Sequence, residues 1–265
     1  AAIPKELLPV YDRPSLELVV AEAVAAGCDR IVLVSSRGKS SLLDHFDRLP
    51  YLENLLRQSG KAAQADAFAE RAQQATFLEV RQGEALGLGH AVLCGAPACA
   101  PGPVAVLLPD DLYLGSPAAL GELIDVHAAS GKGVIGLLRI PPAQSRRYGM
   151  VSGDWEGNVF AIDRLVEKPA PEEAPSDLAI TGRYVLPETI FDALRTTGRG
   201  ALGEIQLTDA LDQLVDRNGM CGIVPTAPRY DAGHHGGLLL AGLRCALDSD
   251  QDGSLRTQIE AELAR

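Results

Sequence analysis

The stretch "PVAVLLPDD" (residues 103–111) decides the fold, because a continuous apolar run ends there in two carboxylates. Such a run predicts a strand buried on both faces, in a sheet covered by helices. Ligands of open α/β sheets bind just beyond the carboxyl ends of the strands, which is where Asp110 and Asp111 lie. A carboxylate at that place can hold Mg²⁺ against phosphate oxygens. Taken alone, however, an Asp-Asp pair is more often a helix cap or a solvated turn.

Similar apolar runs occur on both sides of this stretch and alternate with helical patterns. The runs that we expect to form strands are 30–36, 75–81 and 133–140. The helical pattern before the first of them begins at Pro14 and ends at Gly27, which is the usual punctuation of a helix. Apolar strands separated by helices predict a parallel sheet with helices on both faces.

Beyond residue 145 the sequence predicts a different arrangement. The segment "YGMVSGDWEGNVFAIDRLVEKP" (148–169) is typical of antiparallel strands around a turn at Gly153–Gly157. Three helices are predicted further on, in 203–217, in 237–247 and in the polar tail from Ser249. An antiparallel portion and C-terminal helices are therefore expected beside the main sheet.

Composition limits the classes of protein that need to be considered. The chain has 265 residues, of which 46% are hydrophobic, so 1–265 is expected to form a single domain with a sizeable core. The net charge of −11 argues against a general nucleic-acid or anionic-membrane surface. No apolar run approaches the ~20 residues of a membrane span, and we expect no signal peptide. The five cysteines form no Cys-x-x-Cys pair, which favours reduced thiols and a cytoplasmic location.

A glycine-rich loop, "VRQGEALGLGHAV" (80–92), runs from a predicted strand into a predicted helix. It is neither a P-loop nor a dinucleotide-binding fingerprint, because the required residues after the glycines are absent. Gly87 and Gly89 would let the backbone approach a flat ligand, and Gln82 could pair with a base edge through donor and acceptor. A simple tight turn explains the loop equally well.

Two further segments carry charged side chains that could bind a ligand. In "VEKP" (166–169), Pro169 should hold Lys168 extended, so that Glu167 and Lys168 face opposite ways, although an edge-strand charge pair is the simpler explanation. In "YDAGHHGG" (230–237), Asp231 could cap a helix or bind a divalent cation. The adjacent histidines, His234 and His235, have poor geometry for a shared ion, and their role stays open.

The order of these segments resembles one known family. The matching stretches are "AIPKELLPV", "IVLVSS", "VRQGEALGLGHAVLC", "PVAVLLPDD", "YGMV", "VEKP", "PSDLAITGRYVL", "GEIQLTDA" and "DAGHHGG". Together they extend from residue 2 to residue 237, and they resemble the bacterial UTP–glucose-1-phosphate uridylyltransferases (UDP-glucose pyrophosphorylases) of the sugar-nucleotidyltransferase family. The resemblance implies a Rossmann-like, mixed, mostly parallel sheet with helices on both faces. It also implies a small antiparallel sugar-binding portion and C-terminal helices.

The resemblance also implies a reaction and a set of site residues. Glucose 1-phosphate would attack the α-phosphorus of UTP in line, with Mg²⁺ as cofactor, to give UDP-glucose and pyrophosphate. By this resemblance, Lys5 would bind phosphate near the reacting centre, Lys168 would bind the sugar phosphate, and Asp110 and Asp231 would bind the metal. Gln82 and Gly87 would recognise the uracil. The glucose would be bound by Gly149, Glu167, Gly182 and Glu204. Asp110 thereby counts among the catalytic residues with Lys5 and Lys168.

The chain departs from the family pattern in two places. Relatives usually have a strand and a Gly-x-Gly-Thr-Arg loop just before the Pro-Lys-Glu match at Lys5, and this sequence has neither. Because that strand is central to the family's sheet, we expect that residue 1 is not the biological N-terminus. The second departure is "GHHGG" (233–237), where relatives often carry a lysine.

Two alternative functions stay open at this point. A sibling enzyme, such as a thymidylyltransferase, would use another nucleotide or sugar, because base choice rests on few contacts. A catalytically inactive sugar-nucleotide-binding protein would explain the missing loop. The polar helix at the end of the chain could pack against a second copy, which makes a homo-oligomer possible.

Overall fold

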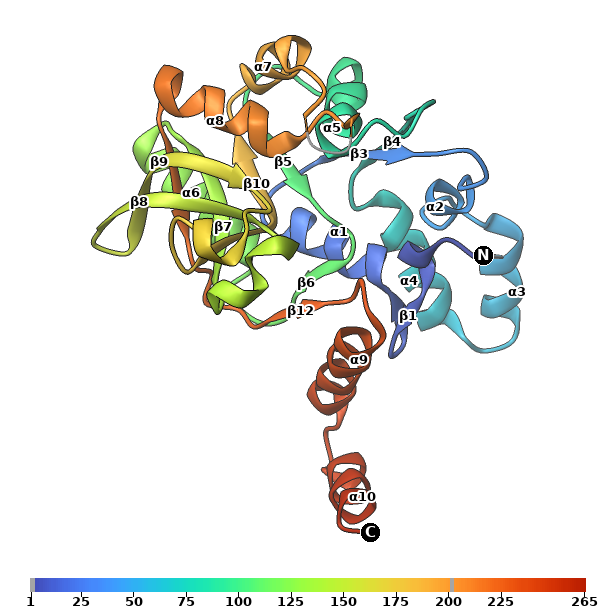
Figure 1. Cartoon of the computed structure of the whole chain (residues 1–265). Coiled ribbons are helices and arrows are strands. Elements are labelled where there is room, and N and C mark those ends of the chain that lie inside the picture. Colours follow the sequence, from blue (N-terminus) through green and yellow to red (C-terminus); the bar gives the residue numbers. More distant parts are fainter. Residues whose placement is uncertain (1–2, 201–202) are drawn as a thin grey trace.

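The structure is a computed structural model that describes residues 3–200 and 203–265. Its largest sheet has six strands in the order β5-β10-β7-β11-β9-β8, and Figure 1 shows it beside a smaller sheet of β3 and β4. The strands of the large sheet are β5 (Val104–Leu107), β7 (Gly133–Arg139), β8 (Gly149–Glu156), β9 (Val159–Glu167), β10 (Leu178–Leu186) and β11 (Met220–Ile223). The other sheets pair β1 (Pro9–Val10) with β2 (Arg13–Pro14), β3 (Arg30–Ser35) with β4 (Thr76–Arg81), and β6 (Asp111–Tyr113) with β12 (Arg229–Asp231).

The mixed α/β class is confirmed, but the prediction of a mostly parallel sheet is wrong. Among the described strands, β3–β4 and β7–β11 are parallel, whereas the pairs β5–β10, β10–β7, β11–β9 and β9–β8 are antiparallel. Much of the difference comes from β10, which lies between β5 and β7 and runs against both. Every residue of β10 is buried, so its apolar pattern identifies a central strand without fixing its direction.

The predicted antiparallel hairpin is formed by β8 and β9, although its turn is displaced. The chain turns at Gly157, whereas Gly153 lies inside β8 at a shift of register against β9. Gly153 has a φ of 147°, and a Cβ there would lie 1.8 Å from the carbonyl oxygen of Ala161, so only glycine fits this bulge. β8 also pairs with β10 through Met150 and Ala179. This pairing brings the start of the hairpin beside the centre of the sheet.

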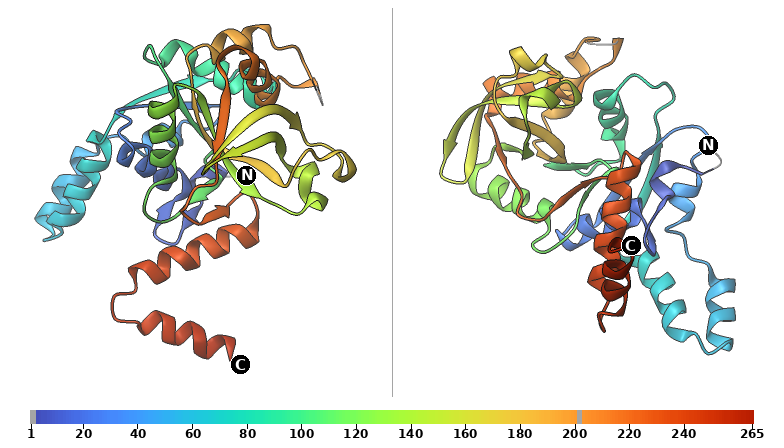
Figure 2. Two further views of the ribbon diagram at one scale, coloured as in Figure 1. Left: turned by 90° about the vertical axis from the view of Figure 1, so that its left-hand side faces the viewer. Right: turned by 60° about the horizontal axis from the view of Figure 1, so that its bottom comes forward.

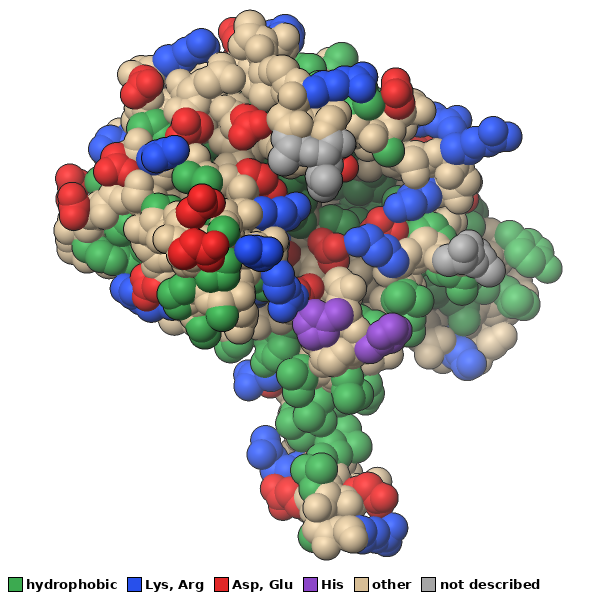
Figure 3. Space-filling view, viewed as in Figure 1, with side chains coloured by type: hydrophobic (Ala, Val, Ile, Leu, Met, Phe, Trp, Pro, Cys, Tyr) green, Lys and Arg blue, Asp and Glu red, His purple; other side chains and the backbone are tan. Residues whose placement is uncertain are grey.

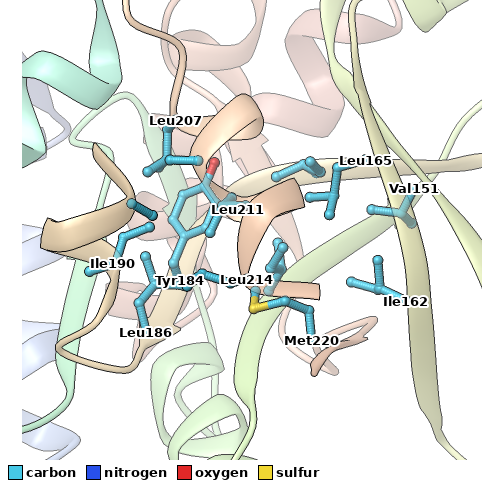
Figure 4. Close-up of a cluster of buried hydrophobic side chains, with 14 of the residues drawn as sticks. Val151, Ile162, Leu165, Tyr184, Leu186, Ile190, Leu207, Leu211, Leu214 and Met220 are labelled. Atoms are coloured by element: carbon cyan, nitrogen blue, oxygen red, sulfur yellow. The ribbon is translucent and has the colours of Figure 1, made fainter. Parts of the chain in front are cut away.

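Helices cover both faces of the large sheet, as predicted. The helices are α1 (Ser15–Ala25), α2 (Ser41–Asp44), α3 (Pro50–Gln58), α4 (Ala62–Gln73), α5 (Leu88–Gly95), α6 (Ala119–Ser130), α7 (Ile190–Thr196), α8 (Leu207–Asn218), α9 (His235–Ser249) and α10 (Ser254–Leu263). One face packs against α6, with Val185 and Leu123 in a shared cluster. The opposite face packs against α8, where Tyr184 meets Leu211 and Leu214 (Figure 4). Adjacent residues of β10 thus belong to two different cores, which is the alternation expected of a strand.

An apolar cavity of about 460 Å³ separates β3 from β5, with α1 and α5 at its borders. Both strands contribute side chains to its lining, among them Val32, Val34 and Val106. Within the described residues, β3 pairs with β4 alone and β5 with β10 alone, so each strand has an edge without a partner. The lining has the apolar character that a buried strand needs. The expectation that residue 1 is not the biological N-terminus stays a prediction.

The C-terminal helices α9 and α10 form an arm that projects from the body, as Figures 1 and 2 show. The base of α9 packs on β1 and β12. In the same part of α9, Leu239 is 73% exposed and Leu240 is 55% exposed, and in α10 Leu263 is 82% exposed. No helix in the described part of the chain is both long and apolar enough to cross a membrane.

Candidate functional site

A polar cavity of about 240 Å³, here called the site cavity, opens at the carboxyl end of β5. Six of the predicted site residues line it: Asp110, Gly149, Glu167, Lys168, Gly182 and Asp231. They come from segments far apart in the sequence, and Figure 3 shows acidic and basic side chains gathered around a hollow on this face. The sugar-binding and metal-binding predictions therefore fall largely on one place in the structure.

Lys5 lies in a short 3₁₀ helix, η1 (Lys5–Leu7), and its Nζ donates a hydrogen bond to Asp110 Oδ2 at 2.6 Å. The side chain of Lys5 is 60% exposed and that of Asp110 is 35% exposed, so an entering ligand can reach both. Burial alone lowers the pKa of Lys5, but the hydrogen bond to Asp110 and the charge of Asp110 outweigh it and raise that pKa. Lys5 is therefore a fixed positive charge at the metal-binding corner predicted from the sequence.

The ladder between β6 and β12 brings the second predicted metal ligand to this corner. It sets Asp231 opposite Asp111, and the next amide, that of Ala232, donates to the carbonyl oxygen of Asp110 at 2.8 Å. A Cβ placed on Gly233 would lie 3.0 Å from Asp231 Oδ1 and 3.5 Å from Asp110 Oδ2. The carboxylates of Asp110 and Asp231 therefore share one corner of the site cavity, although 121 positions separate them in the numbering of the chain.

Asp111, in contrast to its neighbour, is 5% exposed and faces inward. Its carboxylate accepts hydrogen bonds from the Gly182 amide at 2.6 Å and from Arg229 Nε at 2.5 Å. Burial alone lowers the pKa of Arg229, but the charge of Asp111 and the hydrogen bond to it raise that pKa overall. Asp111 thus fixes β10 and β12 relative to each other at the wall of the site cavity.

Glu167 and Lys168 both line the site cavity, so the expectation that they face opposite ways is wrong. Lys168 has a φ of 46°, in the left-handed region, instead of the extended conformation expected before Pro169. The amide of Lys168 donates to the carbonyl oxygen of Tyr148 at 3.1 Å, and its Nζ lies 3.2 Å from Glu167 Oε1. Thr208, at the start of α8, donates to Glu167 Oε2 at 2.6 Å. Such backbone strain clusters at functional sites, where surrounding contacts hold it.

Two glycines of the site are required by close packing. A Cβ on Gly182 would lie 2.7 Å from Leu108 Cβ and 2.9 Å from Asp111 Cβ. A Cβ on Gly149 would lie 2.9 Å from Ile180 Cδ1 and 3.2 Å from Glu167 Oε2. Both glycines line the site cavity, and a larger residue at either position would have to displace the side chains packed against it.

The remaining predicted residues lie beside the site cavity and not in its lining. Gln82 Nε2 donates to the carbonyl oxygen of Gly87 at 3.1 Å, so the two predicted nucleotide-binding residues do meet. A Cβ on Gly87 would lie 2.8 Å from Glu204 Cβ. Glu204, predicted with the sugar-binding group, is thus placed beside the nucleotide loop, and it accepts a hydrogen bond from Gln206, which lines the site cavity.

The residues of the shared corner fit a magnesium ion better than a protein-enclosed metal. In the part of the chain that the structure describes, no group of three or more His, Cys, Asp or Glu side chains is arranged to hold a metal. Mg²⁺ requires fewer protein ligands than that, since it binds through one or two carboxylates and completes its coordination shell with water and substrate phosphates. Asp110 and Asp231 supply that number of carboxylates. His234 instead caps α9, because its Nδ1 accepts from the Gly237 amide at 3.0 Å.

The sequence interpretation missed several residues of the site. Arg147, Thr208 and Arg229 all line the site cavity. Arg147 contacts the predicted Asp231 and Thr208 the predicted Glu167, whereas Arg229 contacts Asp111. The sequence could have indicated Arg229. It lies two positions before the predicted ligand Asp231, and alternate residues of a strand share one face. Arg147 and Thr208 had no such signal, since their contacts cross between elements.

Comparisons of the sequence with family models and with known proteins show which family the chain is similar to. The family model described as "Nucleotidyl transferase" matches residues 1–241. The chain belongs to the nucleotidyl transferase family. This nucleotidyl transferase is 40% identical to UTP–glucose-1-phosphate uridylyltransferase YngB of Bacillus subtilis, over 99% of this chain and 86% of that protein. It is 37% identical to UTP–glucose-1-phosphate uridylyltransferase of Pseudomonas aeruginosa, over 91% of this chain and 87% of that protein.

Solved structures resemble this nucleotidyl transferase over most of their length. UTP-bound UGPase from Acinetobacter baumannii superposes with a TM-score of 0.86 and 36% identity, covering 99% of this chain and 92% of that one. UDP-glucose pyrophosphorylase complexed with UDP-glucose gives a TM-score of 0.83 and 34% identity, covering 93% of this chain and 91% of that one. The family resemblance inferred from sequence motifs is therefore confirmed at the level of the fold.

Proposed function

We propose that the chain is a UTP–glucose-1-phosphate uridylyltransferase, which converts UTP and glucose 1-phosphate to UDP-glucose and pyrophosphate. The observation that carries the proposal is the corner where Asp110 and Asp231 meet beside Lys5, opposite the cavity-lining Glu167 and Lys168. Relatives carrying this name match nearly the whole chain, and solved structures with UTP or UDP-glucose bound share its fold.

The reaction balances without a covalent intermediate on the enzyme. A phosphate oxygen of glucose 1-phosphate forms a bond to the α-phosphorus of UTP, and the bond from that phosphorus to the β-bridging oxygen breaks. Pyrophosphate leaves with the electron pair. A phosphate monoester has a second pKa near ~6, so its oxygen is already anionic at neutral pH and needs no general base. Catalysis then rests on positioning and on neutralising charge.

The described residues can be assigned to these two tasks. Lys5 would bind a phosphate near the reacting centre, and Lys168 would bind the phosphate of the sugar. Glu167, held by Thr208, would accept charge-assisted hydrogen bonds from glucose hydroxyls, with the backbone at Gly149 and Gly182 as close neighbours.

The proposal also includes a metal ion and a nucleotide pocket. Asp110 and Asp231 would hold Mg²⁺, which when bound neutralises charge on the α-phosphate. Gln82, Gly87 and Glu204 would border the nucleotide from the neighbouring loop. All five cysteines are free thiols, which supports a cytoplasmic location as part of the proposal.

The test is release of pyrophosphate by the purified chain supplied with Mg²⁺, glucose 1-phosphate and either UTP or dTTP. We expect turnover with UTP to exceed turnover with dTTP clearly. A preference for dTTP would instead identify a thymidylyltransferase. Binding of UDP-glucose without any turnover would identify an inactive sugar-nucleotide-binding protein, the second alternative that the sequence left open.

A further inference from the structure

Arg147 is a cationic residue of the site cavity to which the sequence interpretation gave no role. It ends the 3₁₀ helix η3 (Pro142–Arg147), which is tied to the segment after Glu167 and Lys168. Ser145 Oγ donates to the carbonyl oxygen of Pro169 at 2.8 Å, and Ser145 is fully buried. The backbone that carries Arg147 is therefore anchored on the side of the site cavity where Lys168 lies.

The side chain of Arg147 reaches away from this anchor to the metal-binding corner. Its Nη2 lies 3.2 Å from Asp231 Oδ2, while Asp231 Oδ1 accepts from the Gly233 amide at 3.0 Å. The Arg147 side chain is 55% exposed, and its guanidinium carbon lies 5.5 Å from the centre of the Tyr148 ring. Together with the contact between Lys5 and Asp110, this means that each predicted metal ligand is paired with a cation whose side chain is more than half exposed.

These pairs cannot persist when a divalent cation binds. A guanidinium within hydrogen-bonding distance of Asp231 Oδ2 repels a metal ion approaching the same oxygen, because the two are like charges a few ångströms apart. Arg147 must therefore leave Asp231 as the metal enters. Its anchored backbone keeps the released guanidinium at the site cavity beside Lys168, where a planar fork of donors suits phosphate oxygens.

We propose that Arg147 exchanges partners during the reaction cycle: it neutralises Asp231 in the free protein and binds the phosphate of the sugar 1-phosphate once the metal is present. The second half of this exchange rests on the proposed function, whereas the first half rests on the contact with Asp231 alone. Arg147 thereby neutralises Asp231 in the empty site, as Lys5 neutralises Asp110, and becomes a phosphate-binding residue in the filled one.

The test compares R147Q and R147K with the wild type, and R146Q serves as the matched control. Arg146 precedes Arg147 in the same 3₁₀ helix and is exposed, and the lining of the site cavity does not include it. The first measurement is the dissociation constant of Mn²⁺ for the protein alone, by electron paramagnetic resonance. The second is the dissociation constant of glucose 1-phosphate in the presence of Mn²⁺, by titration calorimetry. Pyrophosphate release by the wild type is measured first and reports on the proposed function separately.

In R147Q we expect Mn²⁺ to bind about threefold more tightly, because the competing ion pair is gone. Glucose 1-phosphate should bind about tenfold more weakly, because a charged hydrogen-bond donor is lost. R147K should fall between R147Q and the wild type, and R146Q should match the wild type in both measurements. Mn²⁺ binding that is unchanged or weaker in R147Q would overturn the proposal whether or not the wild type is active. Glucose 1-phosphate binding within twofold of an active wild type would overturn its second half.

Discussion

At the scale of single residues, the site shows how two adjacent aspartates acquire different roles. Asp110 is open to solvent and contacts Lys5, whereas Asp111 is buried and holds Gly182 and Arg229. The sequence presented them as an equivalent pair at the end of a strand. Their difference comes from the chain turning directly into β6, which points one carboxylate outward and the next inward.

Replacing Asp110 by Asn should remove a metal ligand while changing almost no volume. We expect turnover to fall about 100-fold or more, since a metal ion contributes several kcal/mol to stabilising transition-state charge. The melting temperature should stay close to that of the wild type. Pyrophosphate release and thermal unfolding would be measured on the same preparation, and a matching loss of stability would indicate a structural role for Asp110 instead.

Replacing Asp111 by Asn should reduce the stability of the fold, which the replacement of Asp110 should leave nearly unchanged. The substitution leaves the largely buried guanidinium of Arg229 without its negative partner, which should lower the free energy of unfolding by about 3 kcal/mol. Urea-induced unfolding of D111N beside D110N makes the comparison, because the two variants carry the same chemical change at neighbouring positions. If D111N were as stable as D110N, the buried pair would not fix the frame of the site as described.

The sequence predicted the placement of some site residues well and of others poorly. The family resemblance gave Lys5, Asp110 and Asp231 roles around one reacting centre, and in the structure they lie close together, with Lys5 in direct contact with Asp110. The orientation of Lys168 was wrong, because the rule for residues before proline is overridden here by a hydrogen bond to Tyr148. Arg147 could not be found at all, since its contact with Asp231 joins two elements whose proximity only the fold determines.

At the scale of elements, one buried ion pair joins a helix to the centre of the large sheet. Arg183 of β10 is fully buried and contacts Glu22 of α1, with Nη2 at 2.8 Å from Oε2. Glu22 Oε1 also accepts from the amide of Leu120 near the start of α6, and Arg183 Nη1 donates to the carbonyl oxygen of Leu108. The pair therefore orders α1, α6 and the end of β5 around β10.

Removing one member of this pair should be costly, and removing both should cost less. R183M should lower the free energy of unfolding by about 3–5 kcal/mol, because it leaves Glu22 as an uncompensated buried charge. The double variant R183M/E22L replaces both charges by apolar groups and should recover part of that loss. Chemical denaturation of the two single variants and the double variant gives the coupling. A double variant that loses the sum of the two single losses would contradict a coupled pair.

A second cluster links α1 to α4 and makes stability depend on acidity. Glu17 Oε2 lies 2.7 Å from His45 Nε2 and 3.5 Å from Arg71 Nη1. Burial alone raises the pKa of Glu17, but the hydrogen bond from His45 and the neighbouring positive charges lower it below its usual 4.5. The unfolded chain then binds more protons than the folded chain below about pH 4.5.

It follows that Glu17 contributes stability that is fully present above pH 4.5 and is lost as the pH falls through its lowered folded pKa. We expect E17Q to flatten the dependence of the free energy of unfolding on pH in this acidic range. The measurement is urea unfolding at pH values from neutral down to the acid limit. An E17Q variant with the same acid dependence as the wild type would show that other carboxylates dominate.

At the scale of the whole molecule, the sequence identified the parts better than their arrangement. The strand runs 30–36, 75–81 and 133–140 were placed within a residue or two, because continuous apolar runs bounded by turn residues are a strong local signal. The direction and neighbours of β10 were not predictable, since a wholly buried strand shows the same pattern in parallel and antiparallel sheets. Non-local pairing was thus the limit of the sequence interpretation.

The projecting arm bears on the expectation of a homo-oligomer, which stays a prediction. Its leucines Leu239 and Leu240 are 73% and 55% exposed. We expect the chain to self-associate through this surface, because apolar patches of this kind mark contact sites. Light scattering after size exclusion would give the mass of the wild type and of L239E/L240E. A wild type that is monomeric at high concentration would contradict the expectation.

The apolar cavity between β3 and β5 affects how the chain can pair with extended segments of other polypeptides. Among the described residues, β3 and β5 each have one edge that pairs with no other strand, and these two edges lie on either side of the apolar cavity. An extended apolar segment that entered this cavity could form backbone hydrogen bonds with β3 on one side and with β5 on the other. Unpaired strand edges are templates for pairing with another chain, so we expect this cavity to be the place where the described part of the chain most readily adds a strand.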